Sequence, residues 1–419
     1  MGKLEDGRTV FVPRTAPGDL VELAGLREHA RFARARLARL VEAGPGRTQP
    51  RCAHYLAEDC GGCQFQHLDA GTQLEAKYGI VADALTRIGR LDLPVPPVIA
   101  ADDCWGYRSR ITLGVGAGRR FAGFHPLDQP ERVFALERCE IAVPALNRLW
   151  QGLRSLLHLL PPDARQLVLR LDRDSGLHVV VKAQGDQAWG RGKRLAEQLA
   201  VRQVHATVWW QPERGAPRVV GGDREAFPAT VFEQVHPGLA DRVRHWALEQ
   251  LGAGLDDHVW DLYAGIGETT AALYARGATV ESVELDRRAV DLGERRWHEA
   301  MREAPESQRP EPAAVIRHVG RVEEVIAHLR DPNLVIANPP RAGLNRRVIE
   351  ALLVRRPRRM VYISCDPATL ARDLAQLGGS AEPASRSAAD PWYRITAVQP
   401  FDLFPQTAHV ETVAVLEAM

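Results

Sequence analysis

The apolar and polar positions of this chain alternate most regularly after Phe232. Short apolar runs such as HVWDLYAG and RMVYISC are separated by longer amphipathic stretches such as RRAVDLGERRWHEAM. The short runs predict buried strands, and the amphipathic stretches predict helices. Their alternation predicts an α/β fold with a doubly wound, largely parallel sheet. The last two apolar runs predict terminal strands on either side of a loop.

The residues before this region follow a less regular pattern. Between Cys52 and Ala229, helical stretches and strand pairs are segregated, which predicts an α+β region. Up to about Pro50, short apolar runs alternate with Gly and Pro turns, which predicts a small β module. The arginine-rich stretch LREHARFARARLARLVEA allows two interpretations. It could form a basic amphipathic helix, or two strands with the arginines on one face.

Length and composition narrow the class of protein. A chain of 419 residues is longer than a single hydrophobic core usually accommodates, so two or three domains are expected. The hydrophobic share of 45%, the charged share of 26% and the net charge of +1 are typical of soluble globular proteins. No apolar segment approaches the ~20 residues that cross a bilayer, and the first residues lack a secretory signal. A cytoplasmic protein without a membrane partner is expected, while the balanced charge leaves nucleic acid open.

A glycine turn follows the first strand of the regular region, in DLYAGIGETT (Asp261 to Thr270). Glycines there let the backbone approach a ligand closely at the carboxyl end of a strand. Thr270 stands where the third glycine of a dinucleotide motif would be, which weakens an NAD interpretation. Glu284 ends the next strand and could accept hydrogen bonds from both ribose hydroxyls. A nucleoside ligand such as S-adenosylmethionine fits this pattern, and a plain turn with a solvated glutamate is the alternative.

Two later strand ends carry further candidate chemistry. The turn NPPRAGL begins at Asn338, and its two prolines form a rigid segment without amide donors. Cys365 ends the following strand, where it could be a nucleophile or a small core residue. Pyrimidines need such an attack at C6 before C5 accepts a methyl group, and a base must then remove the C5 proton. His409 and Glu411, late in the chain, are candidates for that base.

Three closely spaced cysteines lie in a different part of the chain. Cys52, Cys60 and Cys63 form a C-x7-C-x2-C pattern. In a reducing compartment, such spacing indicates a metal site more often than a disulfide. A fourth thiolate must come from elsewhere, and four thiolates can hold either zinc or a 4Fe–4S cluster.

Five segments resemble the S-adenosylmethionine-dependent RNA uracil-5-methyltransferases in order and spacing: DLYAGIG, VELD, NPPRAG, SCDPATLARDL and FDLFPQTAHVE. Upstream, GRTVFVPRTAPGDLVEL resembles their N-terminal TRAM β-barrel, CGGCQFQHL resembles their iron–sulfur segment, and VFEQVHPGLADRV resembles the entry to their catalytic domain. The chain is identified as a member of this family over nearly its whole length. The resemblance also favours strands in the arginine-rich stretch.

The resemblance implies roles for individual residues. Cys365 would add to C6 of the target uridine, and Glu411 would take the C5 proton before the thiolate is eliminated. Arg341 would lie near the reacting centre. The donor-binding positions would be Gln234, Tyr263, Gly265, Glu284 and Asn338.

The resemblance also assigns the metal site. Cys139, rather than Cys104, would be the fourth ligand with Cys52, Cys60 and Cys63, and the group would be a 4Fe–4S cluster with a structural or RNA-orienting role. Some positions depart from the commonest family pattern. Asn338 stands where Asp is frequent, His236 stands where many members have Asn, and the gap after Cys52 is longer than usual.

The implied architecture has three domains: a TRAM-like β-barrel over 1–49, a central α+β RNA-binding and iron–sulfur domain over 50–230, and a Rossmann-like class I methyltransferase domain over 231–419. Candidate phosphate contacts are Arg108, Arg110, Arg119, Arg120 and the arginines between Arg27 and Arg39.

The implied function is transfer of a methyl group from S-adenosylmethionine to C5 of a uridine in ribosomal RNA, through a covalent adduct. The same chemistry on transfer RNA, methylation of cytosine C5, and a non-catalytic, zinc-stabilised RNA-binding protein are the alternatives. The expected partner is RNA, ribosomal in preference to transfer RNA. A monomer without an obligate protein partner is expected.

Overall fold

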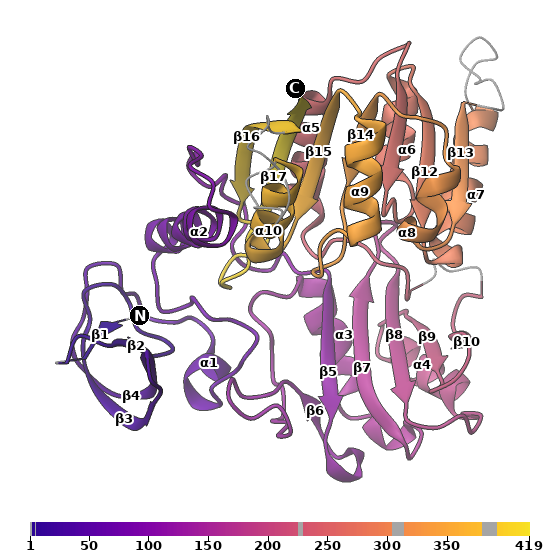
Figure 1. The fold of residues 1–419 in the computed structure, drawn as a ribbon. Helices are drawn as coiled ribbons and strands as arrows, with labels where there is room; N and C mark the ends of the chain where they lie inside the picture. Colours follow the sequence, from indigo (N-terminus) through magenta and orange to yellow (C-terminus); the bar gives the residue numbers. More distant parts are fainter. Residues whose placement is uncertain (1, 5, 225–228, 304–313, 379–391) are drawn as a thin grey trace. The chain divides into compact units, whose positions relative to one another are not determined.

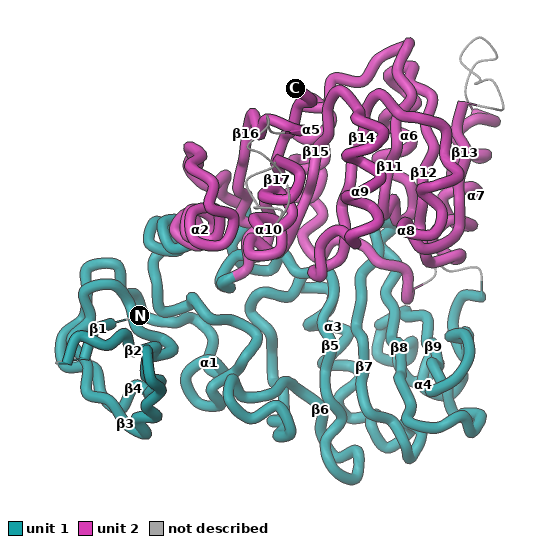
Figure 2. Tube along the Cα trace, in the orientation of Figure 1, with its two compact units in different colours: residues 1–76, 103–227, 405–408 teal, residues 77–102, 228–404, 409–419 magenta. Residues whose placement is uncertain are grey.

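The structure is a computed structural model that describes residues 2–4, 6–224, 229–303, 314–378 and 392–419 (Figure 1). The chain divides into two compact units, each built from several chain segments (Figure 2). Unit 1 comprises residues 1–76, 103–227 and 405–408, and unit 2 comprises residues 77–102, 228–404 and 409–419. In the described part of the chain, no helix is both long enough and apolar enough to cross a bilayer.

Unit 1 begins with a four-stranded sheet in the order β1-β2-β4-β3. Its strands are β1 (Gly2–Lys3), β2 (Thr9–Phe11), β3 (Leu20–Glu28) and β4 (Phe32–Glu42). In β4, Ala33 and Ala35 are buried, whereas Arg34 and Arg36 are exposed. This period of two is that of a strand with one buried face. The strand interpretation of the arginine-rich stretch is therefore confirmed, and the helix interpretation is wrong.

A six-stranded sheet forms the rest of unit 1, in the order β10-β9-β8-β7-β5-β6. Its strands are β5 (Arg110–Val115), β6 (Ala122–Gly123), β7 (Ala164–Leu171), β8 (Leu177–Ala183), β9 (Thr207–Gln211) and β10 (Arg218–Gly221). Only the β8–β9 pair among these is parallel. Helices α3 (Pro144–Leu153) and α4 (Gly192–Val201) pack their apolar residues with the sheet in one core. The segregated α+β pattern predicted for this region is present.

Unit 2 is built on a seven-stranded sheet in the order β13-β12-β11-β14-β15-β17-β16 (Figure 1). Its strands are β11 (His258–Leu262), β12 (Thr279–Glu284), β13 (Val315–Val319), β14 (Leu334–Ala337), β15 (Arg359–Ser364), β16 (Tyr393–Phe401) and β17 (Glu411–Ala418). Strands β11 to β15 are parallel, whereas β17 runs antiparallel to both β15 and β16. The predicted largely parallel sheet is confirmed, and the antiparallel pair at its edge is the departure.

Helices cover both faces of this sheet. The helices of unit 2 are α5 (Pro237–Leu251), α6 (Glu268–Ala275), α7 (Arg287–Glu303), α8 (Val322–Val325), α9 (Arg346–Arg355) and α10 (Pro367–Leu377). Successive strand residues enter opposite cores: Val259 packs with α5 and α6, whereas Trp260 packs with α9 and α10. The short α1 (Ala53–Ala57) belongs to unit 1, and α2 (Ala70–Ala84) contributes residues to both units. Burial on both faces explains why the strands are almost continuously apolar.

Candidate active site

Four parallel strands of unit 2 end at the same edge of the sheet: β11 at Leu262, β12 at Glu284, β14 at Ala337 and β15 at Ser364. Ligands of open α/β sheets bind at this carboxyl edge. The structure therefore brings most of the predicted site residues to one side of one sheet. These residues are Tyr263, Gly265, Glu284, Asn338 and Cys365.

The glycine turn after β11 adopts a left-handed backbone at two of its predicted residues. Tyr263 has φ 64° and Gly265 has φ 58°. For a tyrosine this conformation costs on the order of 1–2 kcal/mol, and such strain is concentrated at functional sites. A side chain at Gly265 would meet no described atom within 4 Å, so the space beside this glycine is open. The turn can therefore admit a ligand against its backbone.

Glu284 is held in place by the backbone around it. Its Oε2 atom accepts a hydrogen bond from the Gly265 N–H at 2.9 Å, and its Oε1 atom accepts one from the Asp286 N–H at 2.8 Å. A carboxylate offers about four lone-pair sites, so each oxygen can accept one more donor. The half-buried carboxylate is thus oriented for the two hydroxyls of a ribose.

Asp261 supports the same turn and was not among the predicted site residues. The Thr270 hydroxyl donates to Asp261 Oδ2 at 2.6 Å, which ties the end of β11 to the first helical turns of α6. Burial raises the pKa of Asp261 to about 6, although the Thr270 hydrogen bond opposes that shift. An acidic residue inside the apolar run HVWDLY was the signal that could have revealed it.

The other predicted donor residues lie on exposed or half-buried segments of unit 2. The Asn338 side chain is exposed. The backbone N–H of Asn338 donates a hydrogen bond to the carbonyl of Leu262 at 3.2 Å, beside the glycine turn. Gln234 is half-buried and lies three residues before α5. The buried His236 is the N-cap of that helix. The backbone hydrogen bond to Leu262 therefore places Asn338 at the carboxyl edge of the sheet.

Cys365 and Glu411 come from strands that pair directly. In the antiparallel ladder of β15 and β17, Ser364 is opposite Thr412. Cys365 directly follows Ser364, and Glu411 directly precedes Thr412, so both residues lie next to the last pair of this ladder. Opposed residues of an antiparallel pair have Cα atoms about 4.5–5.5 Å apart. The structure therefore brings the predicted nucleophile and the predicted base together, although they are far apart in sequence.

The surroundings of Cys365 and Glu411 disfavour the negatively charged form of both side chains. Glu411 is 1% exposed, and burial raises its pKa to about 8. Its Oε2 atom has no hydrogen-bond partner among the described residues. Burial and the nearby Glu411 also raise the pKa of the half-buried Cys365 thiol, while Arg341 acts in the opposite direction by charge and by a hydrogen bond. A raised carboxyl pKa is what a base operating near neutral pH requires.

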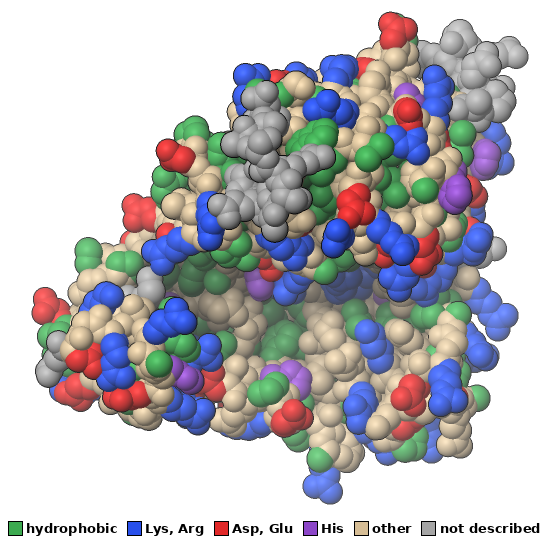
Figure 3. All heavy atoms as spheres, in the orientation of Figure 1, with side chains coloured by type: hydrophobic (Ala, Val, Ile, Leu, Met, Phe, Trp, Pro, Cys, Tyr) green, Lys and Arg blue, Asp and Glu red, His purple; other side chains and the backbone are tan. Residues whose placement is uncertain are grey.

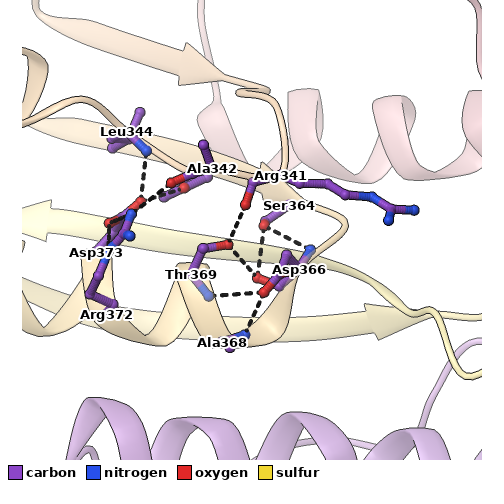
Figure 4. Close-up of polar contacts among 10 residues, drawn as sticks. Arg341, Ala342, Leu344, Ser364, Asp366, Ala368, Thr369, Arg372 and Asp373 are labelled. Atoms are coloured by element: carbon purple, nitrogen blue, oxygen red, sulfur yellow. Dashed lines mark hydrogen bonds and ion pairs between the residues drawn. The ribbon is translucent and has the colours of Figure 1, made fainter.

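Cys365 sits between the end of a strand and the cap of a helix. Asp366 is the N-cap of α10, and its Oδ1 atom accepts the N–H groups of Ala368 and Thr369, each at 3.0 Å (Figure 4). The Ser364 hydroxyl also bonds to the Asp366 backbone, at 3.1 and 3.2 Å. These contacts fix the backbone on both sides of the thiol.

The loop between β16 and β17 is anchored at a buried charge pair. Lys77 is fully buried, pairs with Asp402, and donates to the Phe404 carbonyl at 2.9 Å. His409 is exposed beside the Phe404 ring, whereas Glu411 is buried. Between the two candidate bases, the burial and register of Glu411 favour it over His409.

The four predicted metal ligands all lie in unit 1, and each is buried and free of a disulfide: Cys52, Cys60, Cys63 and Cys139. Burial, followed by the thiols of Cys139, Cys60 and Cys52, raises the pKa of Cys63 to about 12. The other three thiols thus influence that of Cys63. Within the described ranges, no group of three or more His, Cys, Asp or Glu side chains has the arrangement to hold a metal ion.

The candidate phosphate-binding arginines differ in their surroundings. Arg39 pairs with Glu22, and Arg36 pairs with Asp128 at 3.5 Å. The Arg119 guanidinium donates to the Leu160 carbonyl. On the face shown in Figure 3, basic and acidic side chains are interspersed over the four-stranded sheet.

Sequence comparison relates the chain to RNA methyltransferases. A family model described as tRNA (Uracil-5-)-methyltransferase matches residues 224–419. The chain is 31% identical over 455 residues to an uncharacterized RNA methyltransferase of Gloeobacter violaceus, covering 100% of this chain and 93% of that protein. It is 30% identical over 435 residues to the 23S rRNA (uracil(1939)-C(5))-methyltransferase RlmD of Thiobacillus denitrificans, covering 98% and 95% of the two chains.

Structural comparison gives a consistent fold. The chain resembles the Pyrococcus abyssi tRNA (uracil-54, C5)-methyltransferase in complex with S-adenosyl-L-homocysteine, with a TM-score of 0.71. The sequences are 22% identical, and the match covers 99% of this chain and 98% of that chain. The chain therefore has the mixed α/β fold that the alternating pattern predicted, with the methyltransferase domain that the family resemblance implied.

Proposed function

This chain belongs to the tRNA (uracil-5-)-methyltransferase family of RNA methyltransferases, and we propose that it methylates C5 of a uridine in ribosomal RNA with S-adenosylmethionine as the donor. The observation that carries this proposal is the pairing of β15 with β17, which brings Cys365 and the buried Glu411 to the same end of one ladder. A nucleophile and a base on the same edge as a nucleoside-type turn are the groups that this reaction needs.

The proposed chemistry divides into three steps at the pyrimidine ring. The Cys365 thiolate forms a bond to C6, and the electron pair of the C5–C6 double bond moves onto C5 and its conjugated carbonyl. C5 then takes the methyl group. Glu411 next removes the C5 proton, the double bond re-forms, and the bond between C6 and sulfur breaks to release the thiolate. When bound, S-adenosylmethionine would supply the methyl group as a sulfonium electrophile and would leave as the neutral thioether S-adenosylhomocysteine.

The donor would bind at the carboxyl edge of β11, β12 and β14. The oriented Glu284 carboxylate would accept the ribose hydroxyls, and the open space at Gly265 would admit the donor against the backbone. Tyr263 would pack beside the adenosine, while Gln234 and Asn338 would complete the site. The target base must leave its RNA stack to reach Cys365.

The cysteines of unit 1 are proposed to hold a 4Fe–4S cluster. Four buried, free thiols fit four-thiolate ligation in residue type and burial, and the resemblance favours iron–sulfur over zinc. Cys52, Cys60, Cys63 and Cys139 would be the ligands, with a structural or RNA-orienting role. The four-stranded sheet supports the proposed TRAM-like module over 1–49, which with the central region 50–230 would hold the flanking RNA.

The choice of RNA rests on the relatives. The relative named for 23S rRNA matches along nearly the whole chain, which favours ribosomal RNA. The family model is named for tRNA, so transfer RNA is the second candidate. Cytosine C5 methylation and a non-catalytic, zinc-stabilised RNA-binding role are the remaining alternatives.

Nucleoside analysis distinguishes these alternatives. The purified protein is incubated with methyl-labelled S-adenosylmethionine and unmodified 23S rRNA or transfer RNA, and the digested nucleosides are separated. Label in 5-methyluridine from ribosomal RNA is expected. Label only in transfer RNA would change the substrate, label in 5-methylcytidine would overturn the base, and no label in either RNA would overturn the proposed reaction.

A further inference from the structure

The turn that follows Asn338 is held by three side chains from one face of α10 (Figure 4). The Thr369 hydroxyl lies 3.1 Å from the Arg341 carbonyl and shares its one proton between that carbonyl and the Asp366 carbonyl, also at 3.1 Å. Arg372 Nη2 donates to the Ala342 carbonyl at 2.9 Å. Asp373 Oδ2 accepts the Leu344 N–H at 2.8 Å. Positions i, i+3 and i+4 of a helix share one face, so these contacts grip nearly the whole 341–344 segment at once.

Asp373 is the centre of this arrangement. It is fully buried and pairs with Arg372 at 2.7 Å. Its Oδ2 atom also accepts the hydroxyl of Tyr362 at 2.7 Å, and Tyr362 lies on β15 three residues before Cys365. A single carboxylate therefore connects the turn to α10 and to the strand that carries the thiol.

The backbone of the turn is built for this approach. Gly343 has φ 79°, and a Cβ atom there would lie 2.4 Å from Asp373 Oδ2, so only glycine fits. Pro339 and Pro340 have no N–H groups and cannot anchor the turn by donating hydrogen bonds. Anchoring of the turn therefore depends strongly on the side chains of α10.

Arg341 links this turn to Cys365. Its side chain is exposed and extends away from the contacts around Asp373 (Figure 4). Thr369 Oγ1 lies 3.1 Å from both the Arg341 carbonyl and the carbonyl of Asp366, the residue after Cys365, so the two backbone segments are neighbours. The positive charge of Arg341 acts to lower the pKa of the Cys365 thiol. A long, exposed arginine loses considerable conformational entropy when it is ordered beside another group. Because the backbone at Arg341 is already fixed, only the side-chain entropy has to be lost in that contact.

We propose that Thr369, Arg372 and Asp373 form a clamp that positions the 341–344 turn and thereby holds the Arg341 guanidinium beside the Cys365 thiol. The clamp rests on the proposed function only in treating Cys365 as the reacting group. Thr369, Arg372 and Asp373 are positioning residues, because they act on the thiol through Arg341.

Alkylation of Cys365 tests the clamp without RNA or methyl donor. The rate of reaction with iodoacetamide is followed by peptide mass spectrometry between pH 6.5 and 9.5. In Thr369→Val the alkylation of Cys365 at pH 7.5 is expected to slow by about three- to tenfold, because a weaker contact with the cation reduces the thiolate fraction. Thr369→Ser restores the hydroxyl and is expected to restore the rate. Asp373→Asn is expected to act in the same direction as Thr369→Val.

A double-mutant cycle separates positioning from general damage. Arg341→Met alone should slow alkylation, and adding Thr369→Val should slow it no further, because the two changes act through one contact. Alkylation of Cys104 in the same samples should not change. Unchanged Cys365 rates in both clamp variants, or fully additive effects with Arg341→Met, would overturn the clamp. A wild-type protein that fails to methylate RNA yet shows this coupling would overturn the proposed function and leave the clamp standing.

Discussion

Cys365 and Cys63 are both thiols in protected surroundings, yet their neighbours differ in kind. Around Cys63, burial and then the thiols of Cys139, Cys60 and Cys52 raise the pKa. Around Cys365, burial and Glu411 raise the pKa, but the Arg341 guanidinium lowers it. Clustered thiolates repel one another and need a shared cation, as a metal centre supplies. A single thiol with a guanidinium and a buried acid is equipped to form and break a bond.

The strongest test of this contrast is removal of the Cys365 thiol. Cys365→Ala is expected to lower methyl transfer by at least about 1,000-fold, because the attack on C6 has no substitute. It should also abolish the covalent adduct with 5-fluorouridine RNA, measured by gel mobility under denaturing conditions. Cys104→Ala, which changes a half-buried thiol of unit 1, should retain both. Activity in Cys365→Ala would rule out the proposed nucleophile.

Glu411→Gln tests the acid beside Cys365. Turnover is expected to fall by about 100-fold or more, because removal of the C5 proton becomes slow after methyl transfer. A methylated RNA still attached to the protein should then accumulate, and mass spectrometry of the adduct would detect it. Glu417→Gln is the matched control on the same strand, where Glu417 pairs with Arg359 at 2.7 Å. If Glu411→Gln turns over normally, Glu411 is not the base.

The pH dependence of stability tests the burial of Glu411. Its folded pKa of about 8 lies above the ordinary value of 4.5, so the folded state retains a proton that the unfolded state loses. This group's contribution to stability therefore falls as the pH rises from 4.5 toward 8, by at most about 1.4 kcal/mol per pH unit, and is constant above 8. Urea unfolding of Glu411→Gln should lack this slope. Parallel curves for the variant and the wild type would contradict the shift.

Cys63→Ser tests the other thiol environment and should have the smallest effect on catalysis. Loss of one ligand is expected to remove iron and the brown colour of anaerobically purified protein, measured by metal and sulfide analysis. Methyl transfer should fall by no more than about tenfold, since these thiols take no part in bond formation. Cys104→Ser should keep the metal content. Stoichiometric zinc in the wild-type protein would show that the four cysteines hold zinc rather than a 4Fe–4S cluster.

Local patterns predicted much of this molecule. The carboxyl-edge positions of Tyr263, Glu284 and Cys365 could be predicted because apolar runs mark strands and polar residues mark their ends. The clamp residue Asp373 was missed, since an aspartate in the amphipathic LARDL looks like any solvated helix position. Lys77 and Asp402 were missed for a similar reason: a buried charge pair between distant segments leaves no periodic signal.

The sequence alone determined the order of elements and the chemistry available at each strand end. These follow from hydrophobic periodicity and from turn residues, which act over a few positions. Only the tertiary structure decided that β17 pairs antiparallel with β15, so that Glu411 and Cys365 lie at the same end of the ladder. It also decided that the four cysteines are all buried in unit 1 and that α10 holds the 341–344 turn. Pairing and packing between distant segments depend on the whole core, which no local pattern encodes.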